Sequence, residues 1–118
     1  MQTLYHIARN QDWQKAKNAG VYTISSLGKT LDQVGFIHMS FASQVKMVAD
    51  SIYTSTPNLV LLQIDPDKLT GEVKIEAVPG TNEKFPHLYG PLPTAAVTNV
   101  SEYQLEADGQ FPAVVYDR

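Results

Sequence analysis

The feature that most constrains the fold is a nearly continuous apolar run over residues 59–64, Leu-Val-Leu-Leu-Gln-Ile. Turn-forming residues bound it on both sides, with Pro57-Asn58 before it and Asp65-Pro66 after it. An apolar run of strand length that does not alternate is typical of a strand covered on both faces. We therefore expect residues 59–64 to form the central strand of a sheet.

The rest of the chain predicts shorter strands and two helices. Alternating or short apolar runs predict strands over residues 3–8, 36–40, 73–77, 85–88, 96–105 and 111–116. Pro91 and Pro93 confine any strand around them to an edge or a bulge. A helix after Pro93 is the alternative for the segment that begins at residue 96.

The helices are expected over residues 10–19 and 41–53. Asn10 is the predicted N-cap of the first helix, and Gly20 is expected to end it. In the second, apolar residues at positions 45, 48, 49 and 52 recur at helical spacing, and Ser40 or Ser43 is the predicted cap.

This order of elements favours one α+β domain over residues 1–118, with a mainly antiparallel sheet and two or three short helices. The connections between the late strands are too short for helical crossovers. Neither a GxGxxG pattern nor a Walker A pattern occurs in the sequence, so a glycine-rich phosphate loop is not predicted.

Composition excludes several classes of function. The net charge is −3 and the seven lysines are scattered, which disfavours nucleic acid as a partner. No apolar run approaches the roughly 20 residues that span a membrane, so we expect no membrane partner and a cytoplasmic location. Without cysteine there is no disulfide, thiolate nucleophile or cysteine-bound zinc.

The three histidines, His6, His38 and His87, each lie in a short apolar run. An imidazole titrates near neutral pH and is costly to bury without a partner, so a shared site is the first hypothesis. We predict His87, Glu76 and His38 as catalytic residues. The predicted ligand-binding residues are His6, Ser40, Gln44 and Tyr89; by strand alternation Ser40 shares the face of His38, and Tyr89 that of His87.

Other interpretations of these residues remain open. Each histidine could satisfy its hydrogen bonds within the fold, and Glu76 could lie on an exposed sheet face. Three imidazoles and a carboxylate could bind zinc or iron, but the histidines lack the spacing of common ligand pairs, and no metal is predicted. A Ser-His-Asp triad could include Ser40, although no GxSxG elbow surrounds it.

The order of the motifs resembles that of a small bacterial family, the domain of unknown function 952. The resemblance covers essentially the whole chain and rests on these segments: Leu4-Tyr5-His6-Ile7-Ala8, a helix with Trp13, Gly20-Val21-Tyr22, Gly35-Phe36-Ile37-His38 with Ser40 and Gln44, and Phe85-Pro86-His87-Leu88-Tyr89-Gly90. That family in turn resembles the ADP-ribosyltransferase-like superfamily, whose split antiparallel sheet binds NAD in a cleft.

The resemblance implies an NAD or phosphoribosyl ligand and an ADP-ribosyl transfer or hydrolysis. His6 matches the histidine that binds the NAD ribose. Ile37 or His38 stands where the superfamily has a stacking tyrosine, and the third position offers His87 in place of a glutamate. Glu76 would then supply the carboxylate from a neighbouring strand. The alternative is a noncatalytic module that binds a small ligand or a partner.

Overall fold

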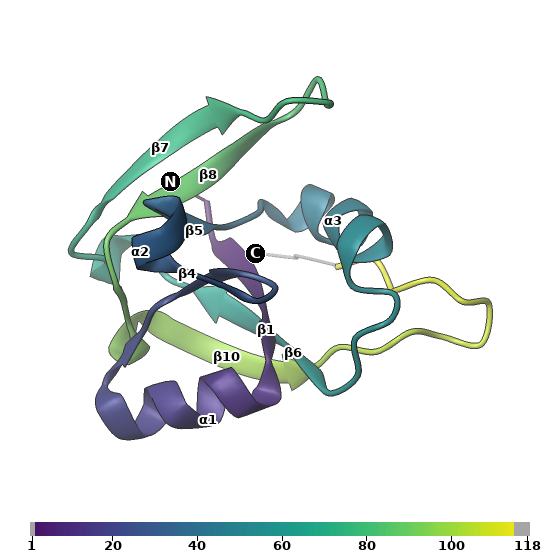
Figure 1. Ribbon diagram of the computed structural model, residues 1–118, viewed down its shortest axis with the longest axis horizontal. Helices are drawn as coiled ribbons and strands as arrows, with labels where there is room; N and C mark the ends of the chain where they lie inside the picture. The colour runs from purple at the N-terminus through teal and green to yellow at the C-terminus, as the bar shows by residue number, and fades with distance from the viewer. Residues whose placement is uncertain (1, 115–118) are drawn as a thin grey trace.

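The computed structural model describes residues 2–114 and has an α+β fold with mainly antiparallel sheets, as predicted (Figure 1). The first sheet has the order β1-β6-β10, with β1 at Leu4–Arg9, β6 at Leu59–Ile64 and β10 at Val97–Glu102. The second has the order β5-β8-β7, with β5 at Ile37–His38, β8 at Lys84–Tyr89 and β7 at Glu72–Ala77. Two short ladders pair β2 (Val21–Tyr22) with β9 (Leu92–Pro93) and β3 (Ile24–Ser26) with β4 (Lys29–Thr30).

The apolar run over residues 59–64 forms the central strand of the first sheet, which confirms the prediction. Leu62 lies opposite His6 on β1 and opposite Val100 on β10. Leu62 and Leu61 point to opposite faces of β6 and pack in two different core clusters. Both faces of β6 are therefore covered, as the absence of alternation in its sequence indicated.

The second sheet places two of the three histidines side by side. His38 on β5 lies opposite His87 on β8, and Lys74 on β7 lies opposite His87 on its other side. β8 is the central strand although it contains Pro86, which has no N–H to donate. The carbonyl of Pro86 still accepts a hydrogen bond from the Met39 N–H at 3.0 Å.

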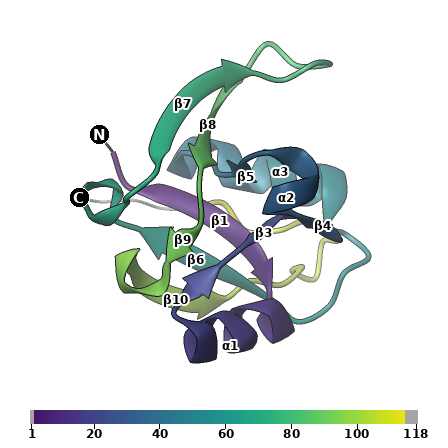
Figure 2. The same cartoon turned by 60° about the vertical axis from the view of Figure 1, so that its left-hand side comes forward.

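The two sheets meet where Tyr5 pairs with Ser40. The backbone N–H of each residue donates to the carbonyl of the other, both at 2.8 Å. In Figure 2 the β7–β8 hairpin rises at one end of the molecule, while α1 (Asn10–Ala19) lies at the other. One core cluster draws on both sheets, with Leu4 and Leu62 from the first and Ile37 and Leu88 from the second.

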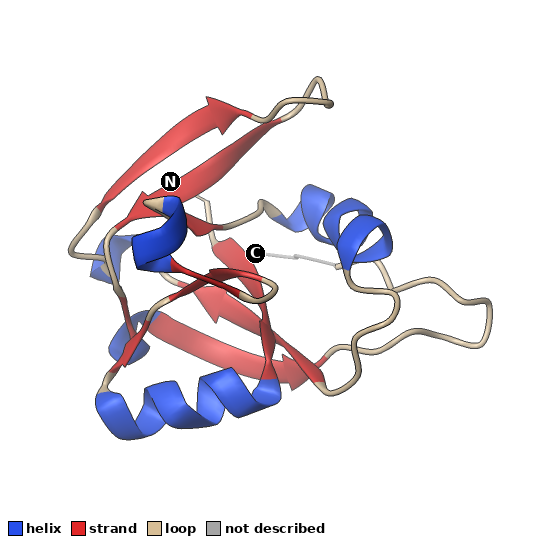
Figure 3. Ribbon diagram, viewed as in Figure 1, coloured by secondary structure: helices blue, strands red, loops and turns tan. Residues whose placement is uncertain are grey.

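The described residues form three α-helices, and Figure 3 shows them around the strands. α1 ends at Ala19 as predicted, and Gly20 follows it as the C-cap with a φ of 85°, which suits glycine. Its N-cap is Arg9 and not the predicted Asn10, because Asn10 already lies in the helix. α2 (Leu31–Val34) is too short to show a periodicity and was not predicted; Thr30 and Gln33 form a capping box at its start.

The helix predicted over residues 41–53 is shorter, and its predicted caps are wrong. A 3-10 turn at Ala42–Gln44 comes first, and α3 then covers Val45–Ile52. Neither Ser40 nor Ser43 caps this segment. The Gln44 side chain does so instead, since its Oε1 accepts from the Phe41 N–H at 3.0 Å.

The prediction of a last strand over residues 111–116 is wrong for residues 111–114, which form no strand; the remainder lies outside the described residues. Phe111 is buried and stacks on Tyr103, with ring centroids 5.0 Å apart. Its N–H donates to the Asp50 carboxylate at 2.9 Å. This segment is therefore held by the Phe111 side chain and by its hydrogen bond to α3, and it adds no strand to a ladder.

None of the helices in residues 2–114 is long and apolar enough to cross a membrane.

Candidate functional site

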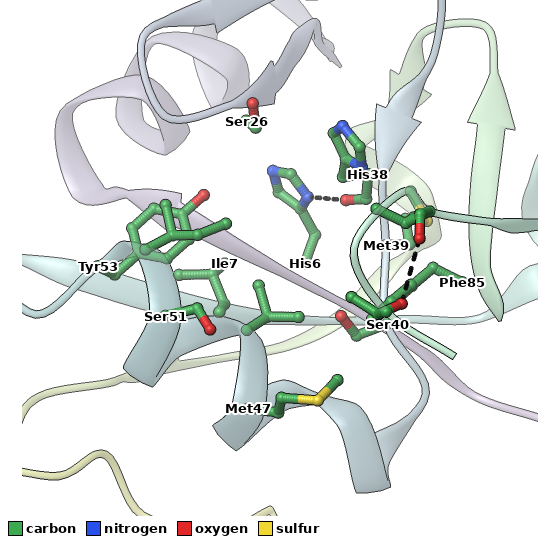
Figure 4. Close-up of a pocket in the computed structure, with 14 residues that line it drawn as sticks. His6, Ile7, Ser26, His38, Met39, Ser40, Met47, Ser51, Tyr53 and Phe85 are labelled. Carbon is green, nitrogen blue, oxygen red and sulfur yellow. Dashed lines mark hydrogen bonds between the residues drawn. The ribbon is translucent and has the colours of Figure 1, made fainter. Parts of the chain in front are cut away.

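A cavity of about 250 Å³ lies among β1, β5, α3 and the tip of the β7–β8 hairpin (Figure 4). Its apolar wall comes largely from α3 and the hairpin, including Met47, Val48, Ile52, Val78 and Phe85. Its polar groups include the imidazoles of His6 and His38 and the hydroxyls of Ser26, Ser40 and Ser51. Among the described residues, no aspartate, glutamate, lysine or arginine lines this cavity.

His6 is buried and joins three strands. Its Nδ1 bonds to the backbone carbonyl of His38, and its Nε2 lies 2.9 Å from the Tyr22 hydroxyl. A carbonyl can only accept, so Nδ1 carries the hydrogen and Nε2 accepts from Tyr22. Burial lowers the pKa of His6 to about 4, so its ring is neutral at pH 7 with both nitrogens in use.

His38 is half-buried, and its imidazole is the one available to a ligand. No hydrogen bond within residues 2–114 involves its ring nitrogens, whereas its carbonyl holds His6 (Figure 4). Burial, and to a lesser extent the neighbouring His87, lowers the pKa of His38 below the usual histidine value. A neutral imidazole with two unengaged nitrogens can donate to a ligand, accept from it or take its proton.

His87 lies behind His38 in a cluster of its own and does not line the cavity. Its ring is perpendicular to that of His38, with centroids 5.0 Å apart, and stacks on Phe36 at 4.0 Å. Its Nδ1 lies 2.8 Å from Oε1 of Glu76, which also accepts from the Tyr89 hydroxyl at 2.7 Å.

These contacts hold Glu76 in its ionised form. The hydrogen bond from Tyr89, and then that from His87, lowers the pKa of the Glu76 carboxyl. The hydrogen bond between Tyr89 and Glu76 also raises the pKa of Tyr89, since the Tyr89 hydroxyl donates to a carboxylate. Lys74 adds a positive charge, with its Nζ 4.7 Å from the centre of the Tyr89 ring.

The structure thus divides the seven predicted site residues into three groups. His6, His38 and Ser40 line the cavity, while His87, Glu76 and Tyr89 form the adjoining cluster. Gln44 belongs to neither group. Its Nε2 donates to the Glu83 carboxylate at 3.1 Å and to the Lys84 carbonyl at 2.8 Å, so it fastens the start of α3 to the hairpin.

Sequence reasoning missed two aromatic partners of the histidines and the apolar wall. Phe36 contacts both His38 and His87. The signal that could have found it is strand alternation, which puts residue 36 on the same face as residue 38. Tyr22, which bonds His6, had no such signal because its strand has two residues. Met47 and Ile52 are 40% and 51% exposed, and only the fold shows that they border a cavity.

The metal-site alternative gains no support. Within residues 2–114 no group of three or more histidine, aspartate or glutamate side chains is placed to hold a metal ion. Both nitrogens of His6 are already engaged, and Glu76 lies with His87 outside the cavity.

Comparison with known proteins gives a family and solved structures. A family model described as "Protein of unknown function (DUF952)" matches residues 7–100. The crystal structure of protein CC0527 from Caulobacter crescentus is similar, with 33% sequence identity, 94% of each chain covered and a TM-score of 0.81. The solution NMR structure of CC0527 has 34% identity, covers 93% of this chain and 91% of that chain, and has a TM-score of 0.76. No curated protein is similar in sequence.

Proposed function

The chain belongs to the DUF952 family of proteins of unknown function, and on that premise we propose that its histidine-lined cavity binds a small ligand through a single ring. The specific ligand we propose is the nicotinamide end of NAD, or a related phosphoribosyl compound, and the associated reaction is ADP-ribosyl transfer or hydrolysis. The observation that carries this proposal is His38, which lines the cavity (Figure 4) and whose ring nitrogens have no hydrogen-bond partner within residues 2–114.

The size and charge of the cavity support this ligand class. A volume of about 250 Å³ suits a single ring with a short substituent and is too small to enclose a dinucleotide. No positively charged side chain of the described residues lines it, so the phosphates of a nucleotide ligand would lie outside. Because burying an unpaired charge is costly, an uncharged wall favours the neutral ring of free nicotinamide over the cationic ring of NAD.

The predicted residues then take different roles. His38 and the Ser40 hydroxyl contact the ligand, while His6 holds the His38 backbone from within the core. His87 and Glu76 act on His38 from behind, and Tyr89 holds Glu76. Gln44 fixes the hairpin over the cavity through its bond to Lys84.

A second candidate is binding without turnover, and one observation favours it. In the superfamily that this family resembles, a glutamate takes part in transfer, whereas no carboxylate of the described residues lines this cavity. Glu76 contacts His87 and is occupied by hydrogen bonds from His87 and Tyr89. The two candidates share the binding site and differ in whether nicotinamide is released.

Saturation-transfer NMR with nicotinamide, NAD and ADP-ribose tests both candidates. We expect transfer to nicotinamide and NAD, and an affinity at least about tenfold lower in His38→Gln, because a hydrogen bond of about 1.4 kcal/mol is lost. Asn18→Gln, on the exposed face of α1, is the matched control and should bind as the wild type does.

Release of nicotinamide from NAD, followed by chromatography, separates the two candidates. Release that His38→Gln abolishes supports the reaction, and binding without release supports the noncatalytic module. Absence of saturation transfer to all three compounds contradicts both.

A further inference from the structure

His87 contains a buried polar atom that has no partner among the described residues. The residue is 3% exposed, and its Nε2 has no hydrogen-bond partner; no other buried side-chain nitrogen or oxygen within residues 2–114 lacks one. Leaving such an atom unpaired is unfavourable, so each case calls for an explanation.

The surroundings of His87 determine which nitrogen carries its hydrogen. The carboxylate of Glu76 can only accept, so the hydrogen of the neutral ring is on Nδ1 and Nε2 presents a lone pair. Phe36, stacked at 4.0 Å with an interplanar angle of 15°, holds the ring in this plane. His87 is therefore a hydrogen-bond acceptor fixed in orientation by two neighbours.

The donor that fits this acceptor is the imidazole of His38. The two residues are directly opposite in the β5–β8 ladder, and their ring centroids are 5.0 Å apart. At this separation a nitrogen of one ring can come within hydrogen-bond distance of a nitrogen of the other. The motion needed is rotation about the Cβ–Cγ bond of His38, a torsion with a broad energy minimum.

We propose that His87 is a positioning residue that accepts a hydrogen bond from a ring N–H of His38 and thereby turns the other, unprotonated nitrogen of His38 toward the cavity. Glu76, His87 and His38 then form one chain of hydrogen bonds from the sheet face to the ligand. The proposal rests on the proposed function in that His38 is the residue that contacts the ligand.

This arrangement defines the chemical class of the group that binds His38. A bare nitrogen accepts, so the ligand presents a hydroxyl or an N–H donor, such as a ribose hydroxyl or a carboxamide. If a proton moves, it passes from a ligand hydroxyl to the unprotonated nitrogen of His38, and the hydroxyl oxygen keeps the electron pair of the broken O–H bond. The imidazolium that forms on His38 is stabilised through His87 by the negative charge of Glu76.

The other titratable groups near this chain are few. β7 contributes Lys74, whose ammonium lies over the Tyr89 ring, and β8 contributes Tyr89, which donates to Glu76. On the side of β1, His6 is neutral and bonds to the His38 carbonyl. Glu72 on β7 lies opposite Tyr89 and raises the pKa of its hydroxyl. Glu76 is the carboxylate that is hydrogen-bonded to His87.

Histidine side-chain NMR of the ¹⁵N-labelled, ligand-free full chain tests the proposal. At pH 7 we expect His87 to carry its hydrogen on Nδ1 only, and His38 to occupy a single tautomer. In His87→Phe, which keeps a ring against Phe36, we expect the pKa of His38 to fall by at least about 0.5, because its imidazolium loses an acceptor. Asn18→Gln, on the exposed face of α1, is the control and should leave the pKa of His38 unchanged.

The sign of the change distinguishes this role from a simple charge effect. In the geometry seen, where the two rings are not hydrogen-bonded to each other, His87 lowers the pKa of His38. If that charge effect is all that His87 does, His87→Phe raises the pKa of His38, and a rise or no change overturns the proposal. A hydrogen on Nε2 of His87 in the wild type also overturns it. Should His87→Phe not fold, Glu76→Gln replaces it: the pKa of His38 must fall as the anion is removed. None of these measurements uses a ligand. The positioning role of His87 can therefore be contradicted while ligand binding holds, and ligand binding can be contradicted while the positioning role holds.

Discussion

His6 connects β1, β2 and β5 through its two ring nitrogens, and its neutral form is what the fold requires. Protonating the ring would place a hydrogen on Nε2, where the Tyr22 hydroxyl now donates. It would also charge a side chain that is 4% exposed. Both effects oppose the protonated form, which is why the pKa of His6 falls to about 4.

This low pKa predicts a specific pH dependence of stability. Between pH 6.5 and about 4 the unfolded chain binds a proton at His6 that the folded chain does not. The free energy of unfolding therefore decreases as the pH falls through this window. The decrease is about 1.4 kcal/mol per pH unit and about 3 kcal/mol in all. Above pH 6.5 the contribution is fully present.

This pH dependence can be measured by urea unfolding, monitored through the fluorescence of Trp13, the single tryptophan. His6→Gln lowers stability at pH 7 and lacks this titration, so its difference from the wild type should narrow as the pH falls to 4.5. Parallel curves for the two proteins across the window would contradict the assignment.

Strand alternation in the sequence places His38 and Ser40 on one face, and both line the cavity. It cannot foresee that the partner of His6 is a backbone carbonyl 32 residues away in the chain. Partners of this kind depend on how sheets meet and not on the residues beside the histidine.

At the level of elements, β7 depends on a glycine just before it. A Cβ at Gly71 would lie 2.7 Å from the Tyr89 carbonyl oxygen and 3.2 Å from a methyl group of Leu88. The backbone oxygen cannot turn away as a side chain could, so the two strands must separate. Tyr89 and Glu76 belong to these strands, which links this packing to the cluster around His87.

Gly71→Ala is expected to destabilise the protein by about 2–3 kcal/mol, as overpacking does. Gly20→Ala is a useful comparison, because its φ of 85° is strained for alanine but the space around it is open. That strain should cost about 1 kcal/mol. Chemical denaturation measures the free energy of unfolding of both variants. A smaller decrease in Gly71→Ala than in Gly20→Ala would contradict the prediction and show that β7 can shift to accept a methyl group.

The elements that the sequence predicts well are those with a strong local pattern. The apolar run of β6 and the alternation of β7 both give strands at the expected residues. α2 has four residues, too few for a helical period. The wrong strand at residues 111–114 has an apolar pattern that serves packing on Tyr103, and periodicity does not distinguish the two uses.

For the whole molecule, the cavity is a product of long-range packing. β1 and β5 provide its imidazoles, α3 provides much of its apolar wall, and the hairpin tip at Val78 and Thr81 contributes from the other side. The three histidine runs pointed to a shared region, and the structure joins them into two adjoining groups. Volume, uncharged lining and the separation of His87 from the cavity follow only from the fold.

The three histidines also provide three separate reporters of ligand binding. A ¹³C–¹H spectrum of the imidazole signals, recorded during titration with nicotinamide at pH 7, tests the central claim that His38 faces the ligand. We predict that the His38 signal shifts most and that the His6 and His87 signals shift less. In His38→Gln, we predict that the His6 and His87 signals no longer respond to nicotinamide. Three unmoved signals at millimolar nicotinamide, or responses of His6 and His87 that persist in His38→Gln, would contradict the account.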